Sequence, residues 1–152
     1  MADYILRKWI SVYYYKGVFY TVPLVIMPSI GLHEEVLPVF TSPDNNLEKL
    51  AESIESAYLS SDVRLPMNQE NSKRKGWDGE KRKFTNTAEK CWSVRWNEDG
   101  SMKMNSATPG QKLRNGMQWN PVPGSEKTFP VPVSSHEIAI EILNQLKIRT
   151  VE

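Results

Sequence analysis

The sequence is poor in the features that mark a secreted or membrane protein. One cysteine among 152 residues excludes a disulfide within the chain, and a single thiol suits a reducing compartment. The longest apolar run, VPLVIMP at 22–28, is far shorter than the roughly 20 residues of a membrane-spanning helix. Asp3, Arg7 and Lys8 interrupt the beginning of the chain, unlike the apolar core of a signal peptide. We therefore expect a cytoplasmic protein with no membrane partner.

The chain also has little net charge. A formal value of +1 gives no general argument for binding nucleic acid or an anionic membrane. The charge is nevertheless uneven, because the segment from Arg64 to Lys90 holds eight basic and four acidic residues. At this length we expect one domain, 1–152, which buries about two-thirds of the surface of its unfolded chain.

Common signatures of catalysis are missing too. The sequence contains no glycine-rich phosphate-binding pattern, no HExxH and no GxSxG. Cys91 could act as a nucleophile beside His33 or His136, but no glycine-rich turn or helix start lies behind it, so we interpret it as structural. A metal site would require 33–35 and 136–137 to converge from distant parts of the chain. We expect no enzyme, no metal and no cofactor.

The first part of the chain predicts a β-hairpin. YILRKWISVYYY at 4–15 and VFYTVPLVIM at 18–27 are rich in residues that favour strands. Lys16-Gly17 supplies the turn between them. Pro23 has no backbone donor, so its position should face no neighbouring strand.

A third strand, EVLPVF at 35–40, is followed by a predicted helix. Ser42-Pro43-Asp44 has the composition of a helix start, since it offers a capping hydroxyl, a proline suited to the first turn and an acidic group. Apolar residues then recur at helical spacing and predict one buried face: Leu47, Leu50, Ala51, Ile54 and Tyr58. The opposite, solvated face carries Glu48, Lys49, Glu52 and Glu55.

Residues 90–104, KCWSVRWNEDGSMKM, predict a second hairpin with its turn at 97–100. Counting by twos places one set of side chains on one face, Trp92, Val94 and Trp96, and another on the opposite face, Cys91, Ser93 and Arg95. Each tryptophan would bury on the order of 200 Å², which explains its presence without a ligand. We therefore interpret this hairpin as scaffold.

The remaining segments predict an irregular stretch, a border strand and a last helix. Residues 105–125 hold three Gly, three Pro and three Asn, with Met117 and Trp119 as expected anchors to the core. In FPVPV at 129–133, the two prolines remove donors from one edge of a strand. Ser134 and Glu137 have capping-box spacing ahead of an apolar stripe, Ile138, Ala139, Ile142, Leu143 and Leu146.

Strands joined by tight turns pair antiparallel, and one-sided helices can cover one face of the resulting sheet. The sequence therefore predicts a single α+β domain. It consists of a mainly antiparallel sheet of about six strands with two amphipathic helices packed on it.

A polar, irregular loop at about 60–90 is the candidate binding segment, because loops this long are usually functional or mobile. A solvated loop, a protein-binding loop and a nucleic-acid-binding loop are all open interpretations of its centre, KRKGWDGEKRK. Asp78 and Glu80 disfavour nucleic acid, whereas Trp and Arg concentrate binding energy at protein interfaces. The candidate residues are Lys73, Arg74, Lys75, Trp77, Lys81, Arg82 and Lys83.

Three stretches together resemble a known family. They are KGVFYTVP at 16–23, an LPVF strand at 37–40 followed by Pro43-Asp44 and an amphipathic helix, and EKCWSVRWNEDGSM at 89–102 followed by a Gly-then-aromatic stretch. These stretches are similar to the immunity proteins of bacterial contact-dependent growth inhibition systems. The similarity runs from about Tyr13 to Leu146, and the sequence departs from the family at 64–83.

The resemblance implies a cytoplasmic inhibitor without enzymatic activity. Such a protein binds and neutralises the C-terminal toxin domain, often a nuclease, of a cognate exoprotein, and in some complexes a toxin hairpin adds to the edge of its sheet. A basic loop would complement the acidic cleft of a metal-dependent nuclease. The alternative is a small nucleic-acid-binding module that uses the 73–83 loop, although nucleic acid is the less expected partner, and a cysteine-dependent enzyme comes third.

Overall fold

A computed structural model describes residues 8–27, 32–35, 39–61, 88–97, 101–113, 116–131 and 133–146. Strands and helices follow one another in this order: β1 (Lys8–Tyr15), β2 (Val18–Met27), β3 (Leu32–Glu35), β4 (Phe40–Pro43), α1 (Leu47–Ser60), β5 (Lys90–Trp96), β6 (Met102–Leu113), β7 (Gly116–Pro121), β8 (Lys127–Phe129) and α3 (Ser135–Leu146).

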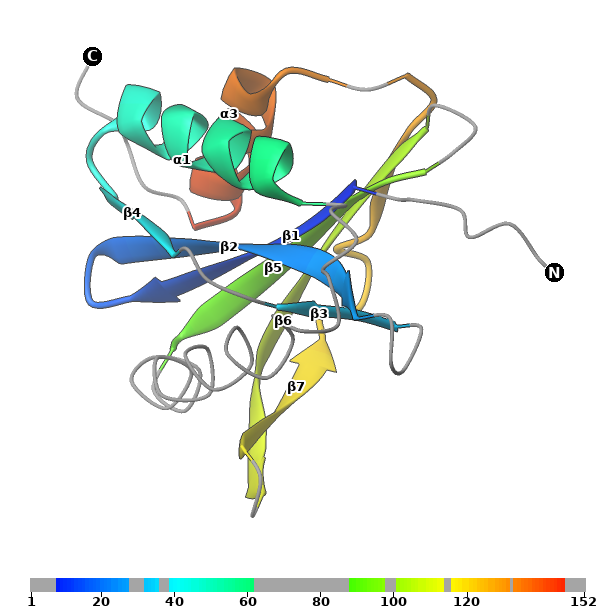
Figure 1. Cartoon of the computed structure of the whole chain (residues 1–152). Helices are drawn as coiled ribbons and strands as arrows, with labels where there is room; N and C mark the ends of the chain where they lie inside the picture. The colour runs from blue at the N-terminus through cyan, green and yellow to red at the C-terminus, as the bar shows by residue number, and fades with distance from the viewer. Residues whose placement is uncertain are drawn as a thin grey trace, which may run out of the picture.

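The strands form one antiparallel sheet in the order β3-β2-β1-β5-β6-β7, with β4 beside β2 and β8 beside β6. The two helices of the described residues, α1 and α3, lie on the same face of this sheet (Figure 1). The main core fills the space between the two layers and includes Ile10, Phe19, Trp92, Ile54 and Ile142. This arrangement confirms the predicted α+β fold.

The opening hairpin is confirmed. Lys16 and Gly17 have φ values of 45° and 80°, the positive values that the tight turns joining right-twisted strands require. Pairs across a two-residue hairpin alternate outward from a hydrogen-bonded pair at the turn, so the Ile10–Pro23 pair is a non-hydrogen-bonded one. The backbone nitrogen of Pro23 therefore faces away from β1.

On that far side, β2 is bordered by two short strands. β4 pairs with β2 up to Thr21, and β3 pairs with β2 from Leu24 onward. Pro23 thus falls where neither strand pairs, as its missing donor requires. The prediction of one strand over 35–40 is wrong, because β3 ends at Glu35 and β4 begins at Phe40.

The opposite border of the sheet is interrupted in the same way. β8 pairs with the beginning of β6 and β7 with its later part. Between them, the Ser125 hydroxyl accepts from the Ser106 amide at 3.2 Å, and the Val122 amide donates to the Ser106 carbonyl at 2.9 Å. The loop joining β7 to β8 therefore provides hydrogen-bond partners for the backbone amide and carbonyl of Ser106, which neither β7 nor β8 pairs with.

Two predictions at this border need correction. Residues 105–125 are not irregular, because β6 continues to Leu113 and β7 follows it. Pairing overrides the Gly, Pro and Asn composition here, with a register shift between Pro109 and Lys112. The border strand predicted at 129–133 lies at Lys127–Phe129 instead, and Pro130 follows its end.

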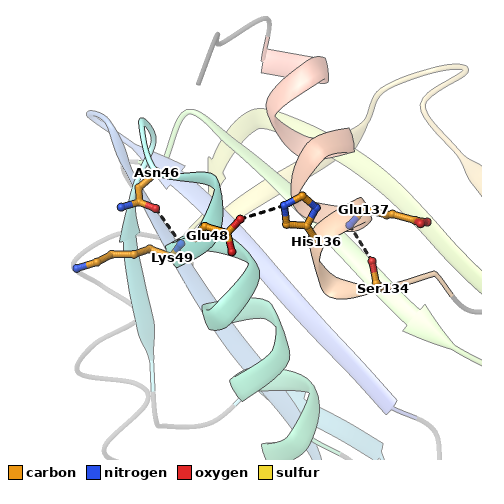
Figure 2. A network of polar contacts seen from close by, with 6 residues as sticks. All are labelled: Asn46, Glu48, Lys49, Ser134, His136 and Glu137. Atoms are coloured by element: carbon orange, nitrogen blue, oxygen red, sulfur yellow. Dashed lines mark hydrogen bonds and ion pairs between the residues drawn. The ribbon is translucent and has the colours of Figure 1, made fainter. Parts of the chain in front are cut away.

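Helix α1 begins later than predicted. Ser42 and Pro43 belong to β4, and the cap is Asn46, whose side-chain oxygen accepts from the Lys49 amide at 3.0 Å (Figure 2). Asp44 is held by the first hairpin, since its amide donates to the Gly17 carbonyl at 2.9 Å. The predicted helix start at Ser42-Pro43-Asp44 is therefore wrong, because β4 occupies Phe40–Pro43 and α1 begins at Leu47.

Asp44 also accepts a hydrogen bond from the Tyr14 hydroxyl at 2.8 Å. Burial, this hydrogen bond and the negative charges of Asp44 and Glu89 raise the pKa of Tyr14 to about 12. The hydroxyl of Tyr14 thus keeps its proton and joins β1 to the segment that enters α1.

The predicted cap of α3 is confirmed. The Ser134 hydroxyl accepts from the Glu137 amide at 3.2 Å, and the first turns of the two helices meet where His136 Nε2 lies 3.2 Å from Glu48 Oε1 (Figure 2). The predicted stripes of both helices also face the core, with Leu50, Ile54, Ile138 and Ile142 buried.

A lysine of β1 binds the carboxyl end of α1. Lys8 Nζ donates to the Tyr58 carbonyl at 3.2 Å and lies 4.8 Å from the centre of the Tyr58 ring. A cation at this end compensates the negative pole of the helix dipole. Neither α1 nor α3, the helices that the structure describes, combines the length and apolar character needed to cross a bilayer.

Candidate protein-binding surface

The predicted binding loop lies outside the described residues. Every candidate residue from Lys73 to Lys83 falls between Ser61 and Ala88, the two described positions that flank this segment. The assignment of these seven residues to binding therefore stays a prediction. The surface that can be described residue by residue is the sheet face opposite α1 and α3. The described residues place no helix on it, and we call it the helix-free face.

Strand pairing arranges the helix-free face in cross-strand rows. Alternate residues of β1, β5 and β6 point to the same side of the sheet, so their side chains meet in register. The rows are Trp9–Arg95–Lys103, Ser11–Ser93–Asn105 and Tyr13–Cys91–Ala107. The middle row consists of short polar side chains between two rows that contain aromatic ones.

One end of this face is a second, smaller core. Tyr13, Val22 and Ala88 are buried there, and the Trp119 ring lies 5.9 Å from the Tyr13 ring. The expected anchoring role of Trp119 is thus confirmed, whereas the side chain of Met117 lies outside the described part. Cys91 packs against this cluster and is half-buried.

The structure disfavours the alternative in which Cys91 pairs with His136. Cys91 faces the helix-free side, whereas His136 belongs to α3 on the other side, so the sheet separates them. The Nε2 atom of His136 instead lies 3.2 Å from a carboxylate oxygen of Glu48. The side chain of His33 lies outside the described residues.

The other end of the helix-free face contains a hollow of about 220 Å³, which we call the Trp9–Arg95 hollow. The space is present because the side chains of the middle row are shorter than those of the adjoining row, Trp9–Arg95–Lys103. Its walls are Trp9, Ser93, Arg95, Lys103, Asn105 and Glu126. Among the charged residues of the wall, Lys103 and Glu126 form an ion pair of 3.3 Å.

A second hollow, of about 290 Å³, lies between β6 and α3. Two of the three charged residues in its wall, Lys127 and Glu141, pair with each other, and the third, Lys90, lies over the Trp92 ring. Lys127 Nζ lies 2.7 Å from Glu141 Oε1, and Gln145 donates to the same carboxylate at 3.1 Å. Burial alone would raise the pKa of Glu141, yet these hydrogen bonds and the Lys127 charge lower it. The contacts of Glu141 therefore join the β8 residue Lys127 to α3.

The acidic face of α1 is solvated, as expected. Glu48, Glu52 and Glu55 are exposed, and Glu55 accepts from the Ser135 hydroxyl at 2.6 Å. Within the described ranges, no group of three or more His, Cys, Asp or Glu side chains is placed to hold a metal ion.

The central hairpin contributes Trp92 to the core and Arg95 to the surface hollow. Trp92 is 1% exposed in the core and donates to Gln145, which confirms its structural role. Trp96 packs against Tyr58 with ring centres 4.7 Å apart. Sequence reasoning placed Arg95 on the face opposite Trp92 and Trp96 but did not find Trp9, its neighbour from β1. The alternation of residues 92–96, WSVRW, was the one sequence signal that separated Arg95 from the tryptophans.

The comparisons with known proteins concern the fold. No protein-family model matches the chain, and no curated protein matches it in sequence. Among solved structures, it is similar to a protein of unknown function from Neisseria meningitidis, with a TM-score of 0.65 and 13% identity over 98% of this chain and 99% of that one.

A second similar structure is a chain of the CdiA-CT/CdiI toxin and immunity complex from Yersinia pseudotuberculosis. Its TM-score is 0.59, at 14% identity over 97% of this chain and 100% of that chain. The likeness therefore extends over the whole fold of both proteins. At such low identity it establishes a shared fold.

Proposed function

We propose that this chain is an immunity protein, which binds and neutralises the C-terminal toxin domain of a cognate contact-dependent growth inhibition exoprotein. The observation that carries the proposal is the whole-chain similarity to a chain of a toxin and immunity complex. The resemblance of its hairpin and helix segments to immunity proteins agrees with the same role.

In this proposal the protein works in the cytoplasm as a binding partner and performs no reaction of its own. The toxin is a nuclease, and the basic residues around Trp77, from Lys73 to Lys83, contact it. Clustered lysines and arginines accelerate association with an acidic cleft, and a tryptophan supplies the kind of side chain that dominates interface energies.

Co-expression tests the proposal. The toxin domain encoded beside this gene is induced alone, with this chain, or with an immunity protein of an unrelated system. We expect growth arrest in the first and third cultures, and survival with co-purification of the two proteins in the second. Growth arrest despite soluble expression of this chain would contradict the proposal.

A further inference from the structure

Arg95 in the Trp9–Arg95 hollow is a cation whose position is fixed in advance. Its Cζ atom lies 5.0 Å from the centre of the Trp9 ring, within the range of a cation–π contact. The indole is fixed in turn, because Trp9 Nε1 donates to the Ser93 hydroxyl at 2.7 Å. A guanidinium held in this way loses little conformational freedom when it binds a ligand.

The positive charge of Arg95 is not neutralised locally. Among the residues that the structure describes, no carboxylate forms an ion pair with Arg95, although the side chain is half-buried. Lys103, its neighbour on β6, is already paired with Glu126. The cation–π contact occupies none of the five N–H donors of the guanidinium, so these remain available to an acceptor.

We propose that the Trp9–Arg95 hollow receives an acidic side chain of the toxin domain and that Arg95 binds its carboxylate. This inference rests on the proposed function and names the chemistry of one contact. A guanidinium can donate two parallel hydrogen bonds to a carboxylate. The Asn105 amide in the wall can donate a further one, and the Trp9 ring covers the apolar stem of the entering side chain.

The hollow fits a protein side chain better than a nucleic acid. A nucleic acid needs several cations along its backbone, because each phosphate contact contributes to affinity. Here Glu126 compensates the Lys103 charge, so the wall offers one uncompensated cation, Arg95, and not a row of them. One uncompensated guanidinium beside a tryptophan instead matches the residue types at the centres of protein interfaces.

The test measures the affinity of the purified chain for the toxin domain encoded beside its gene, by titration calorimetry. Arg95→Gln should weaken binding about tenfold or more, and Arg95→Lys should weaken it less, since it keeps the charge but loses the planar fork. Lys49→Gln is the matched control, because it removes one positive charge from the exposed side of α1. It should leave the affinity unchanged.

A double-mutant cycle identifies the carboxylate. Each Asp and Glu of the toxin domain is changed to its amide, and one such change should weaken binding to the wild-type chain but not to Arg95→Gln. Wild-type affinity in Arg95→Gln, or no acidic toxin residue coupled to Arg95, would overturn the inference while leaving the proposed function intact.

Two other outcomes are distinguishable. If the wild-type chain does not bind the toxin domain, the proposed function fails and this inference fails with it. If Arg95→Gln binds the toxin domain normally but loses salt-dependent binding of a fluorescein-labelled oligouridylate, the hollow binds nucleic acid and the inference is wrong. Thermal unfolding shows whether each variant is folded. If Arg95→Gln does not fold, the affinity of Arg95→Lys for the toxin domain is compared with that of wild type instead.

Discussion

The indole Nε1 atom of Trp92 donates a 2.8 Å hydrogen bond to the side-chain oxygen of Gln145, which joins the central strand β5 to helix α3. Gln145→Leu should lower the free energy of unfolding by about 1–3 kcal/mol, because it leaves a buried donor without a partner. Trp92→Phe removes that donor, so the two substitutions together should cost less than the sum of their separate effects. Additive effects in denaturant unfolding would contradict this coupling.

The two helix caps give a second prediction. Ser134→Ala should lower the free energy of unfolding by about 1 kcal/mol, because the Glu137 amide loses its acceptor. Asn46→Ala should act similarly at the beginning of α1. Ser134→Asp and Asn46→Asp are the controls, since aspartate also caps helices. Equal loss of stability in the alanine and aspartate variants would show that capping is not the cause.

Tyr14 makes stability depend on alkaline pH. Its ordinary pKa of 10.0 applies to the unfolded chain and about 12 to the folded one, so between these values the folded state holds the proton more strongly. This contribution to stability is complete below pH 10 and is lost as pH rises through about 12. Wild type should therefore lose more stability than Tyr14→Phe over that range.

The measurement compares the denaturation midpoints of wild type and Tyr14→Phe across the same pH series. The ultraviolet absorbance of tyrosinate in the folded proteins gives a second readout. The difference between the two titrations should show one group that ionises near pH 12, and a step near pH 10 would contradict the assignment.

The basic loop is tested by charge reversal. Changing Lys75, Arg82 and Lys83 to glutamate should slow association with the toxin domain more than it speeds dissociation, because the loop is proposed to steer the encounter. Stopped-flow mixing measures both rates. The difference from wild type should shrink at high salt, where such steering is screened. An unchanged association rate at low salt would contradict the proposal that the basic loop contributes to toxin binding.

Local patterns in the sequence predicted the elements that depend on local chemistry. Lys16-Gly17 marked the first hairpin, the alternation around Trp92 marked the second, and the apolar stripes gave both helix faces. The beginning of α1 was predicted too early because Asp44, which looks like part of a cap, is bound to the Gly17 carbonyl of the distant hairpin.

The borders of the sheet and the candidate hollow depend on contacts between distant segments. Pro23 signalled a position without a partner, but not that β3 and β4 would lie on either side of it. Likewise, Trp9 and Arg95 become neighbours only because β1 pairs with β5, and nothing in either segment specifies the other. Strand partners this far apart in sequence are set by the packing of the whole domain.

Direct binding to the toxin domain proposed as the partner tests the central claim. Calorimetric titration of the two purified proteins should give a one-to-one complex with a Kd of about 10 nM or tighter, in the range of specific protein complexes of standard size. Addition of the chain should also abolish the activity of the toxin domain at equimolar ratio. No complex at micromolar concentrations of both proteins, together with undiminished toxin activity, would contradict the account.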